Sequence, residues 1–190
     1  MQKIKCHQML SPPMPVTLIG SLVGGRPNFM TAAWVTRVSA KPLLIGAAIG
    51  HAHHTTPGIR ETGTFSVCLP GPDLVAKVDY CGLVSGNAAD KSGLFDVFYG
   101  ELKTAPLIRE CPLCLEVRLT QVVEIPGDDF HIGEIVAAWA DPDILTDGQP
   151  DVEKYRPLLL SLPDNRYWTL GTPVAAAWSV GKSLKNGGGQ

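Results

Sequence analysis

The chain alternates short apolar runs with polar turns, a pattern that predicts a protein built from short β-strands. Residues 16–19 form a short apolar run, and residues 29–35, 43–49 and 65–69 are predicted strands separated by glycine and proline turns. In a second group, residues 115–123 alternate Leu and Val with polar residues, which predicts a strand with one buried face. A turn at residues 126–129 then leads into a long partner strand at residues 130–139.

Two segments have the pattern of short helices. Thr55 or Thr56 is suited to cap the first helix, with Pro57 in its first turn and Gly63 just past its end. The second helix begins near Pro72 and runs to about residue 84. Many short antiparallel strands with few helices predict a mainly β protein, either a barrel or a sandwich.

Length and composition fit one folded domain. The chain has 190 residues without an internal repeat or linker, so we expect a single domain over residues 1–190 with a flexible tail from about residue 183. Hydrophobic residues make up 45% and charged residues 18%, which is enough apolar material for a core. A net charge of -2 with a pI near 6.2 argues against a nucleic-acid partner.

We expect a cytoplasmic protein without a membrane partner. No apolar run approaches the length that spans a bilayer, and residues 1–10 lack the apolar stretch of a signal peptide. Five cysteines is an odd number, which favours a reducing compartment over a disulfide scaffold.

The cysteines include one pair with a spacing that is often reactive. Cys111 and Cys114 form a Cys-x-x-Cys pair, but it precedes a strand, so the helix N-terminus that would lower a thiol pKa is missing. We interpret the pair as structural. The remaining cysteines, Cys6, Cys68 and Cys81, have no spacing that predicts a ligand set.

Three histidines lie close together at His51, His53 and His54. On a strand, His51 and His53 would share a face, but no further ligand stands at a recognisable spacing. Metal binding is therefore a minority interpretation, with odds of roughly one in ten.

Four stretches, taken in order, carry a resemblance to a known family. They are Asn-Phe-Met-Thr-Ala-Ala-Trp at residues 28–34, His-His-Thr leading to Ile-Arg-Glu-Thr-Gly-Thr-Phe-Ser-Val within residues 53–67, Val-Ser-Gly with Asp-Lys within residues 84–91, and Ile-Gly-Glu-Ile-Val-Ala at residues 132–137. Together they resemble the flavin reductase-like, FMN-binding split-barrel family, and most closely its flavoredoxins. The likeness runs from about residue 10 to 182. It implies a mainly β split barrel with a few short helices, one FMN per subunit and a homodimer.

The resemblance also implies which residues bind FMN. Small residues would let the backbone approach the flavin ring, and the helix start near Thr55 would receive the phosphate. Ser85 would bond the ribityl chain or ring edge, and Lys91 the phosphate or the flavin N1–O2 edge. The implied cofactor-binding residues are Asn28, Met30, Thr31, Ala32, Ala33, Trp34, His53, His54, Thr55, Ser85, Gly86, Lys91 and Trp168.

Each of these assignments has an ordinary alternative. The small residues also suit a plain buried strand, at roughly even odds from pattern alone. Ser85 and Gly86 also suit a helix C-cap, and Lys91 a solvated surface lysine. Trp34 and the pair at residues 167–168 either flank the flavin or pack at a dimer contact. Many relatives have Arg or Lys at the place of His53, which makes Lys91 the other source of positive charge.

The implied function is electron transfer through a bound FMN, in sulfite or thiosulfate reduction, with a redox partner protein. The alternative is an NAD(P)H-dependent flavin reductase, and a third hypothesis is a binding module without redox activity. The sequence has no serine–histidine–acid order and no glycine-rich fingerprint for a nicotinamide cofactor. We therefore expect no catalytic side chain, because the flavin itself carries the chemistry.

Overall fold

The structure is a computed structural model that describes residues 3–5 and 12–185. Cys6 and the last five residues of the predicted tail lie outside the described residues, as does most of the segment assessed for a signal peptide.

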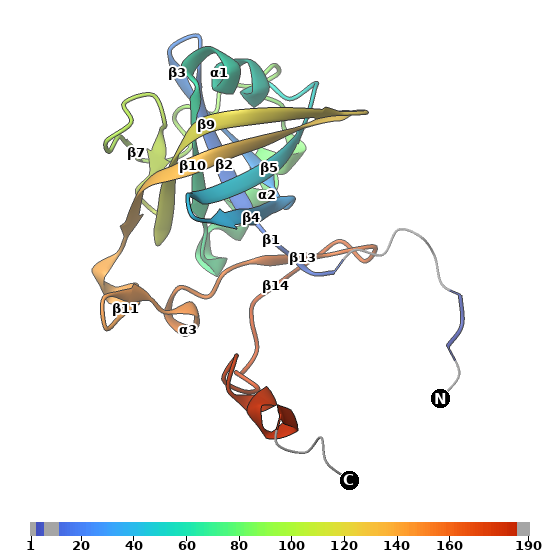
Figure 1. The fold of residues 1–190 in the computed structure, drawn as a ribbon. Helices are drawn as coiled ribbons and strands as arrows, with labels where there is room; N and C mark the ends of the chain where they lie inside the picture. Colours follow the sequence, from blue (N-terminus) through green and yellow to red (C-terminus); the bar gives the residue numbers. More distant parts are fainter. Residues whose placement is uncertain (1–2, 6–11, 186–190) are drawn as a thin grey trace.

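One seven-stranded antiparallel sheet forms the body of the molecule. Its strand order is β3-β2-β6-β9-β10-β5-β4, and β3 also approaches β5, so the sheet curls into a barrel (Figure 1). The strands are β2 (Thr17–Val23), β3 (Arg26–Ala32), β4 (Val35–Ala40), β5 (Leu43–Gly50), β6 (Thr64–Leu69), β9 (Leu113–Ile125) and β10 (Asp128–Ala140). The prediction of a mainly β fold with a few short helices is confirmed.

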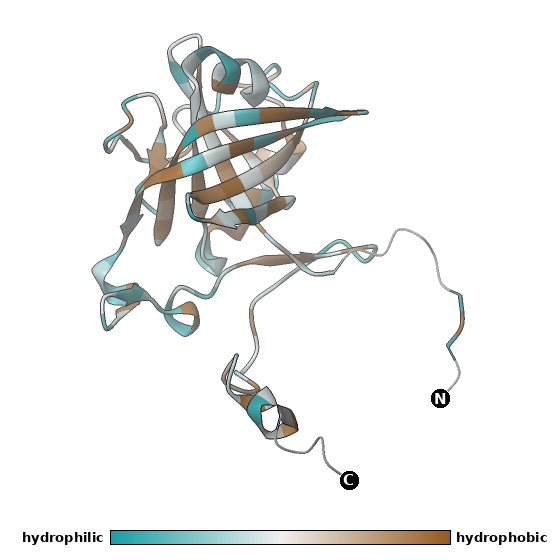
Figure 2. Cartoon of the chain, viewed as in Figure 1, coloured by the Kyte–Doolittle hydropathy of each residue, from teal (hydrophilic) through white to brown (hydrophobic). Residues whose placement is uncertain are grey.

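The inner faces of these strands form the core. Brown, hydrophobic positions dominate the strands at the centre of the barrel, and polar ones alternate with them along β9 and β10 (Figure 2). Phe65, Ile59 and Val117 are fully buried in one core cluster, and Phe29 and Leu18 in a second. The predicted strands at residues 115–123 and 130–139 lie within β9 and β10. The expected single buried face of residues 115–123 is wrong in one place, because the neighbours Glu116 and Val117 are both fully buried.

The strand predicted at residues 29–35 is wrong in one respect. β3 ends at Ala32, and β4 begins at Val35 after a corner. Up to Ala32 the chain pairs with β2, whereas Val35 pairs with Ala47 of β5. The chain changes partner strand at the corner, although its apolar pattern continues without a break.

Two helices flank the sheet. The first, α1 (Thr55–Thr62), ends at Gly63, which has φ 66° and donates its N–H to Ile59 as predicted. The predicted cap is wrong: the residue before the helix is His54, with helical backbone angles and no capping side chain, and both candidate threonines lie in the first turn. The second helix is the 3-10 turn η1 (Pro72–Leu74) followed by α2 (Val75–Leu83), close to the predicted bounds. It packs against β3.

A small three-stranded sheet lies below the barrel, and we call it the strap. It contains β1 (Met14–Pro15), β13 (Leu159–Ser161) and β14 (Arg166–Trp168) in the order β1-β13-β14. Beyond β14, the chain leads away from the barrel to η3 (Val180–Lys185) (Figure 1). The remaining short elements are β7 (Val97–Phe98), β8 (Leu107–Ile108), η2 (Pro142–Ile144), β11 (Leu145–Thr146), β12 (Gln149–Pro150) and α3 (Val152–Tyr155).

Helices of membrane-spanning length and hydropathy do not occur in the part of the chain that the structure describes.

Candidate functional site

Three adjoining cavities form a groove along β3, between helix α1 and helix α2. The first, which we call the apolar end, has a volume of about 280 Å³. The second, the middle, has about 160 Å³, and the third, the polar end, about 250 Å³. The middle shares Met30, Thr31, His53, Gly82 and Leu83 with the apolar end. It shares Asn28, His54, Gly86 and Lys91 with the polar end.

A buried lysine faces the polar end and the middle. Lys91 is 4% exposed, and its ammonium donates to the backbone carbonyl of Val84 at 3.0 Å. Burial lowers the pKa of Lys91, and the nearby Cys81 opposes this in part. The interpretation of Lys91 as a solvated surface lysine is therefore wrong. The burial of Lys91 could not be predicted from the sequence, because it arises where the loop after α2 folds back and the ammonium meets the Val84 carbonyl.

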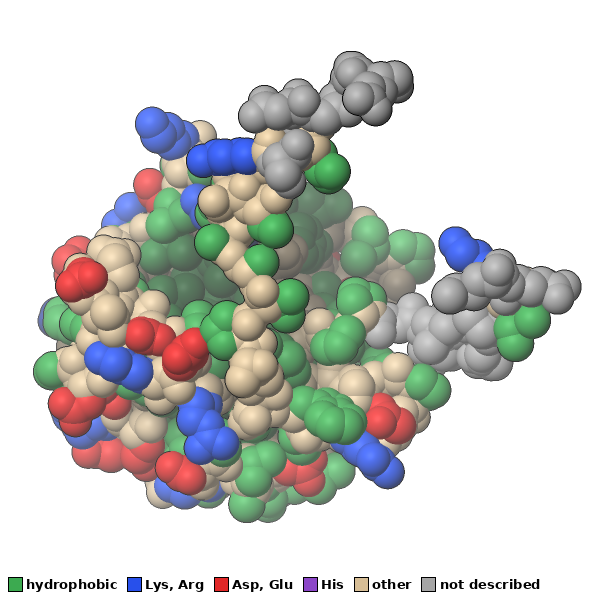
Figure 3. Space-filling model, turned by 90° about the horizontal axis from the view of Figure 1, so that it is seen from below, with side chains coloured by type: hydrophobic (Ala, Val, Ile, Leu, Met, Phe, Trp, Pro, Cys, Tyr) green, Lys and Arg blue, Asp and Glu red, His purple; other side chains and the backbone are tan. Residues whose placement is uncertain are grey.

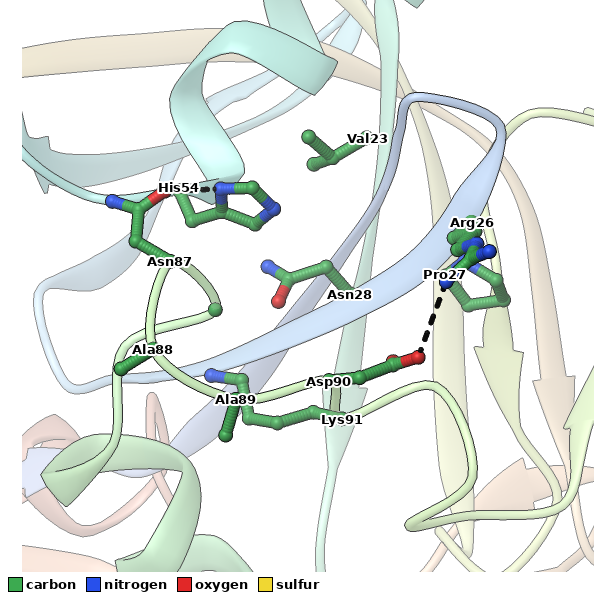
Figure 4. A pocket seen from close by; sticks show the side chains of 11 residues that line it. Val23, Arg26, Pro27, Asn28, His54, Asn87, Ala88, Ala89, Asp90 and Lys91 are labelled. Atoms are coloured by element: carbon green, nitrogen blue, oxygen red, sulfur yellow. Dashed lines mark hydrogen bonds and ion pairs between the residues drawn. The ribbon is translucent and has the colours of Figure 1, made fainter.

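Two side chains of the polar end are fixed by contacts between β3 and α1. The Asn28 amide donates to the Thr55 hydroxyl at 2.8 Å, and both residues are buried. The His54 ring lies 2.6 Å from the Asn87 side-chain oxygen, which orients it. Figure 4 shows His54 from the start of α1, Asn28 from β3 and Lys91 from the loop after α2 around one hollow.

The loop after α2 comes very close to these side chains. A Cβ on Gly86 would lie 2.4 Å from the Asn28 side-chain oxygen, so only glycine fits without a shift. The C-cap of α2 is Val84, which corrects the interpretation of Ser85 and Gly86 as a C-cap. Ser85 instead accepts the backbone N–H of Asn87 at 3.2 Å and holds the turn.

An ion pair stands at the rim of the polar end. Arg26 and Asp90 lie 3.6 Å apart, and both side chains are more than half exposed (Figure 4). Solvent screens such a pair strongly, so Arg26 remains available to an anion that enters here. Arg26 could not be predicted as a site residue, because the glycine turn before it has the pattern of an ordinary hairpin.

The apolar end has an inner wall of strands. Met30, Thr31 and Ala32 of β3 continue into the corner residues Ala33 and Trp34. The rest of this wall is Ala48 and Gly50 of β5, together with His53. The stretch at residues 28–34 that the sequence singled out therefore does line a cavity, and Trp34 stands at its mouth with 58% of its surface exposed.

The outer wall of the apolar end comes from α2 and the strap. Its residues are Asp79, Gly82 and Leu83 of α2, and Met14, Leu160, Leu162 and Tyr167 of the strap and its connections. The Tyr167 hydroxyl donates to the Asp79 carboxylate at 2.8 Å, which joins the strap to the helix. Burial and this contact raise the pKa of Tyr167 to about 12.

Trp168 lies outside the described lining of the groove, whereas its neighbour Tyr167 lines the apolar end. The Trp168 indole N–H instead donates to the Ser161 hydroxyl at 2.7 Å within the strap. Successive residues of a strand point to opposite faces, so only one of the two aromatics can face the cavity.

Three cysteines meet in the core. Cys68 pairs in register with Cys114 across β6 and β9, and Cys111 lies in the same core cluster. None of the three forms a disulfide. Hydrogen bonding with Cys114 and Cys68, together with burial, raises the pKa of Cys111, which suits an unreactive thiol. The spacing along the chain did not reveal Cys68, because its contact depends on strand register.

The described residues contain no group of three or more His, Cys, Asp or Glu side chains placed to hold a metal ion.

Comparison with known proteins gives a consistent result. Residues 9–161 match the family described as flavin reductase like domain. The crystal structure of flavoredoxin from Methanosarcina acetivorans is 51% identical, with a TM-score of 0.94 over 97% of this chain and 100% of the other. Flavoredoxin of Desulfovibrio vulgaris is 32% identical, with a TM-score of 0.87 over 95% and 100%. An FMN-binding protein from Thermus thermophilus, with bound 1-cyclohex-2-enone, is 25% identical, with a TM-score of 0.76 over 93% and 99%. The chain therefore belongs to the flavin reductase-like domain family and has the split-barrel fold that its sequence predicted.

Proposed function

We propose that this chain binds one FMN per subunit in the groove and carries electrons through it, as flavoredoxins are understood to do. The observation that supports this best is the continuity of the groove, in which a middle cavity shares lining residues with an apolar and a polar end. FMN has its parts in the same order: a flat ring system, a hydroxylated ribityl chain and a phosphate with nearly two negative charges. The groove offers each part a matching environment.

The residues of the polar end fit the phosphate. Only one partner, the Val84 carbonyl, accepts from the Lys91 ammonium among the described residues, and an ammonium has three donors. A buried cation with donors to spare is stabilised by an anion that shares its site. The first turn of α1 adds the Thr55 hydroxyl, which accepts from Asn28 and can still donate, and the positive end of the helix dipole. Lys91 then supplies the charge that a neutral His53 does not.

The residues of the apolar end fit the ring system. Ala32, Ala33 and Ala48 present little bulk, so backbone groups of the inner wall remain accessible to the polar ring edge. When bound, the flavin supplies the redox chemistry. The chain would hold it between the β3 corner and the outer wall formed by α2 and the strap, and that wall would limit the access of water.

The proposals of FMN as the cofactor and of a metabolic role rest on the similarity of this chain to its relatives. Flavoredoxins share 51% and 32% of the aligned residues, and the Thermus thermophilus relative is named as FMN-binding. We infer the same cofactor and an electron-carrier role in sulfite or thiosulfate reduction, with a redox partner protein.

A second candidate function is an NAD(P)H-dependent flavin reductase, in which FMN exchanges as a substrate. The openness of the apolar end favours it, because Trp34 and Leu83 at its mouth are 58% and 76% exposed. Such a mouth gives a nicotinamide a path to the flavin without a dedicated dinucleotide fold.

We also propose that the chain is a homodimer. The segment beyond the strap exposes Val174, Trp178 and Leu184 at 100%, 95% and 82% of their surface. Figure 3 shows a hollow lined with hydrophobic side chains on the face below the barrel. A second copy of the chain would bury both features, as large exposed apolar surfaces usually require.

The visible spectrum of the purified protein tests the proposal. We expect flavin absorption bands that persist through dialysis and bleach when a chemical reductant is added. Rapid loss of the bands on dialysis, with fast NADH oxidation once FMN is added back, would favour the reductase. A colourless protein that leaves the fluorescence of added FMN unchanged would refute flavin binding altogether.

A further inference from the structure

The outer wall of the apolar end carries an acid–phenol pair, Asp79 and Tyr167, that the proposed electron transfer does not require. Asp79 stands on α2 and Tyr167 on β14, and the phenol donates to the carboxylate at 2.8 Å. Both residues line the cavity opposite the inner wall of β3 and β5. The pair therefore faces whatever occupies the space beside the ring system.

The charges of the groove are separated along its length. Among the described lining residues of the apolar end, Asp79 is the single acid and no Lys or Arg is present. The polar end is lined by the two cations Arg26 and Lys91 and by one acid, Asp90, which pairs with Arg26. The phenol is neutral at physiological pH, because the ordinary pKa of a tyrosine is already near 10 and burial raises that of Tyr167 further, so the formal negative charge of the pair is that of the Asp79 carboxylate.

We infer that Asp79, positioned by Tyr167, is a specificity-determining residue that makes the apolar end accept neutral or cationic ring-shaped ligands and reject anionic ones. The inference rests on the proposed function, since it concerns the ligand that meets the flavin. A negative charge in the cavity wall repels an anionic ring and leaves a neutral ring of the same shape without this repulsion. Repulsion of this kind is an efficient way to discriminate between ligands of equal shape.

The same charge separation orients the cofactor. An anionic phosphate is attracted to the end with Lys91 and repelled from the end with Asp79. Ligand selection at the apolar end and phosphate binding at the polar end thus both follow from the difference in charge between the two ends of the groove.

Two probes of matched shape and different charge test the inference. Benzamide is neutral and benzoate anionic, and each is titrated against the FMN-loaded protein while the flavin visible spectrum is followed. We expect benzamide to bind at least about tenfold more tightly than benzoate, a difference of about 1.4 kcal/mol. Asp79→Asn should bring the ratio close to one, mainly through tighter binding of benzoate.

Two further variants separate charge from position. Asp73→Asn removes one negative charge from the turn just before α2, at a residue outside the lining of the groove, and should leave the ratio as it is in the wild type. Tyr167→Phe keeps the charge but frees the carboxylate, so the ratio should fall only in part. Circular dichroism confirms that each variant is folded.

Equal binding of the two probes by the wild type would overturn the inference, and so would an unchanged ratio in Asp79→Asn or the absence of binding by either probe. Failure of the proposed function has a different signature, because the protein then retains no FMN. In that case the same titrations on the apoprotein, followed by tryptophan fluorescence, should still give the benzamide preference if the inference holds.

Discussion

At the polar end of the groove, Asn28 and Lys91 are buried and already held by hydrogen bonds behind an exposed rim, whereas at the apolar end one wall is a strap joined to helix α2 through a side-chain hydrogen bond. Asn28 and Thr55 hold each other at 2.8 Å, and Lys91 is buried beneath the α2 loop. Across the groove, Asp79 is exposed and Tyr167 only partly buried. Both ends of the groove lie along β3, but different elements form their other walls.

The two ends of the groove should therefore contribute differently to flavin binding. Groups that are ordered before binding cost little further entropy, so the polar end should contribute most to affinity. A wall on a small separate sheet can adjust, so the apolar end should decide which ring is accepted. Riboflavin, which is FMN without the phosphate, separates the two contributions. The ratio of FMN affinity to riboflavin affinity reports the polar end, and riboflavin affinity alone reports the apolar end.

The largest effect is expected where α1 meets the sheet. A Cβ on Gly58 would lie 2.1 Å from the carbonyl oxygen of Leu22, a backbone atom that cannot rotate away. Gly58→Ala should therefore lower the free energy of unfolding by about 2–3 kcal/mol, despite a helix-propensity gain of about 1 kcal/mol. The helix would also move off β2, so the ratio of FMN to riboflavin affinity should fall toward one.

Chemical denaturation measures the stability of this variant. Gly93→Ala is the matched control, because a Cβ there meets nothing within 4 Å. It should change stability by less than about 0.5 kcal/mol. A Gly58→Ala protein with wild-type stability would show that α1 is not wedged against β2 as described.

The second-largest effect is expected when the charge of Lys91 is removed from the polar end. Lys91→Met should weaken FMN binding by roughly 10- to 100-fold, because a hydrogen bond to a charged group is worth about 1.5–3 kcal/mol. Riboflavin binding should stay the same. Without FMN, the variant should be at least as stable as the wild type, because the substitution removes the free-energy cost of burying a charged ammonium away from water.

Fluorescence titration with both flavins measures these affinities. Lys77→Met removes a lysine of α2 that pairs with Glu110 at 3.3 Å outside the groove, so it should leave both affinities unchanged. Equal loss of FMN and riboflavin binding in Lys91→Met would assign the lysine to the ring rather than the phosphate.

A smaller effect is expected at the apolar end. Trp34→Ala should weaken FMN and riboflavin alike by roughly 3- to 10-fold, because one aromatic contact is worth about 0.5–1.5 kcal/mol beyond its buried area. Tyr99→Ala, at an aromatic residue 39% exposed and outside the groove lining, is the control. If Trp34→Ala changed the affinity ratio instead, the separation of the two ends would be wrong.

The sequence predicted the barrel strands well wherever pairing is local. The alternation at residues 115–123 and the turn at residues 126–129 were enough to predict the pair, because β9 and β10 are neighbours along the chain and form one hairpin. The corner at Ala33 and Trp34 was missed for a physical reason. Both sides of it are apolar, and what changes there is the partner strand, from β2 to β5. Partner choice depends on distant residues, which a local pattern does not contain.

The candidate site shows the same limit. Stretches that approach the groove as continuous segments, such as residues 28–34 and the start of α1, were found from the sequence. Asp79 was not found, because its partner Tyr167 lies 88 residues away along the chain, on β14 of the strap. The burial of Lys91 was also not predictable, since it follows from how one loop closes over another.

The smallest effect concerns a residue that lines neither end of the groove. His131 is fully buried on β10, and its Nδ1 lies 3.1 Å from the Asp129 carbonyl. Its Nε2 has no hydrogen-bond partner among the described residues. Burial lowers the pKa of His131, so between that value and the ordinary value near 6.5 the unfolded chain binds the proton more readily than the folded one.

The free energy of unfolding should therefore fall as the pH drops below about 6.5, with a slope of at most about 1.4 kcal/mol per pH unit from this residue. Asp129 titrates in a separate window, because its hydrogen bond with Arg60 lowers the pKa of that carboxyl below an ordinary value that is already acidic. His131→Phe should flatten the slope near pH 6 in urea unfolding measured from pH 5 to 8. At each pH the ratio of FMN to riboflavin affinity should match the wild type, since the groove lining does not include His131. A variant that lost the affinity ratio but kept the slope would place this histidine in communication with the polar end, contrary to the geometry described.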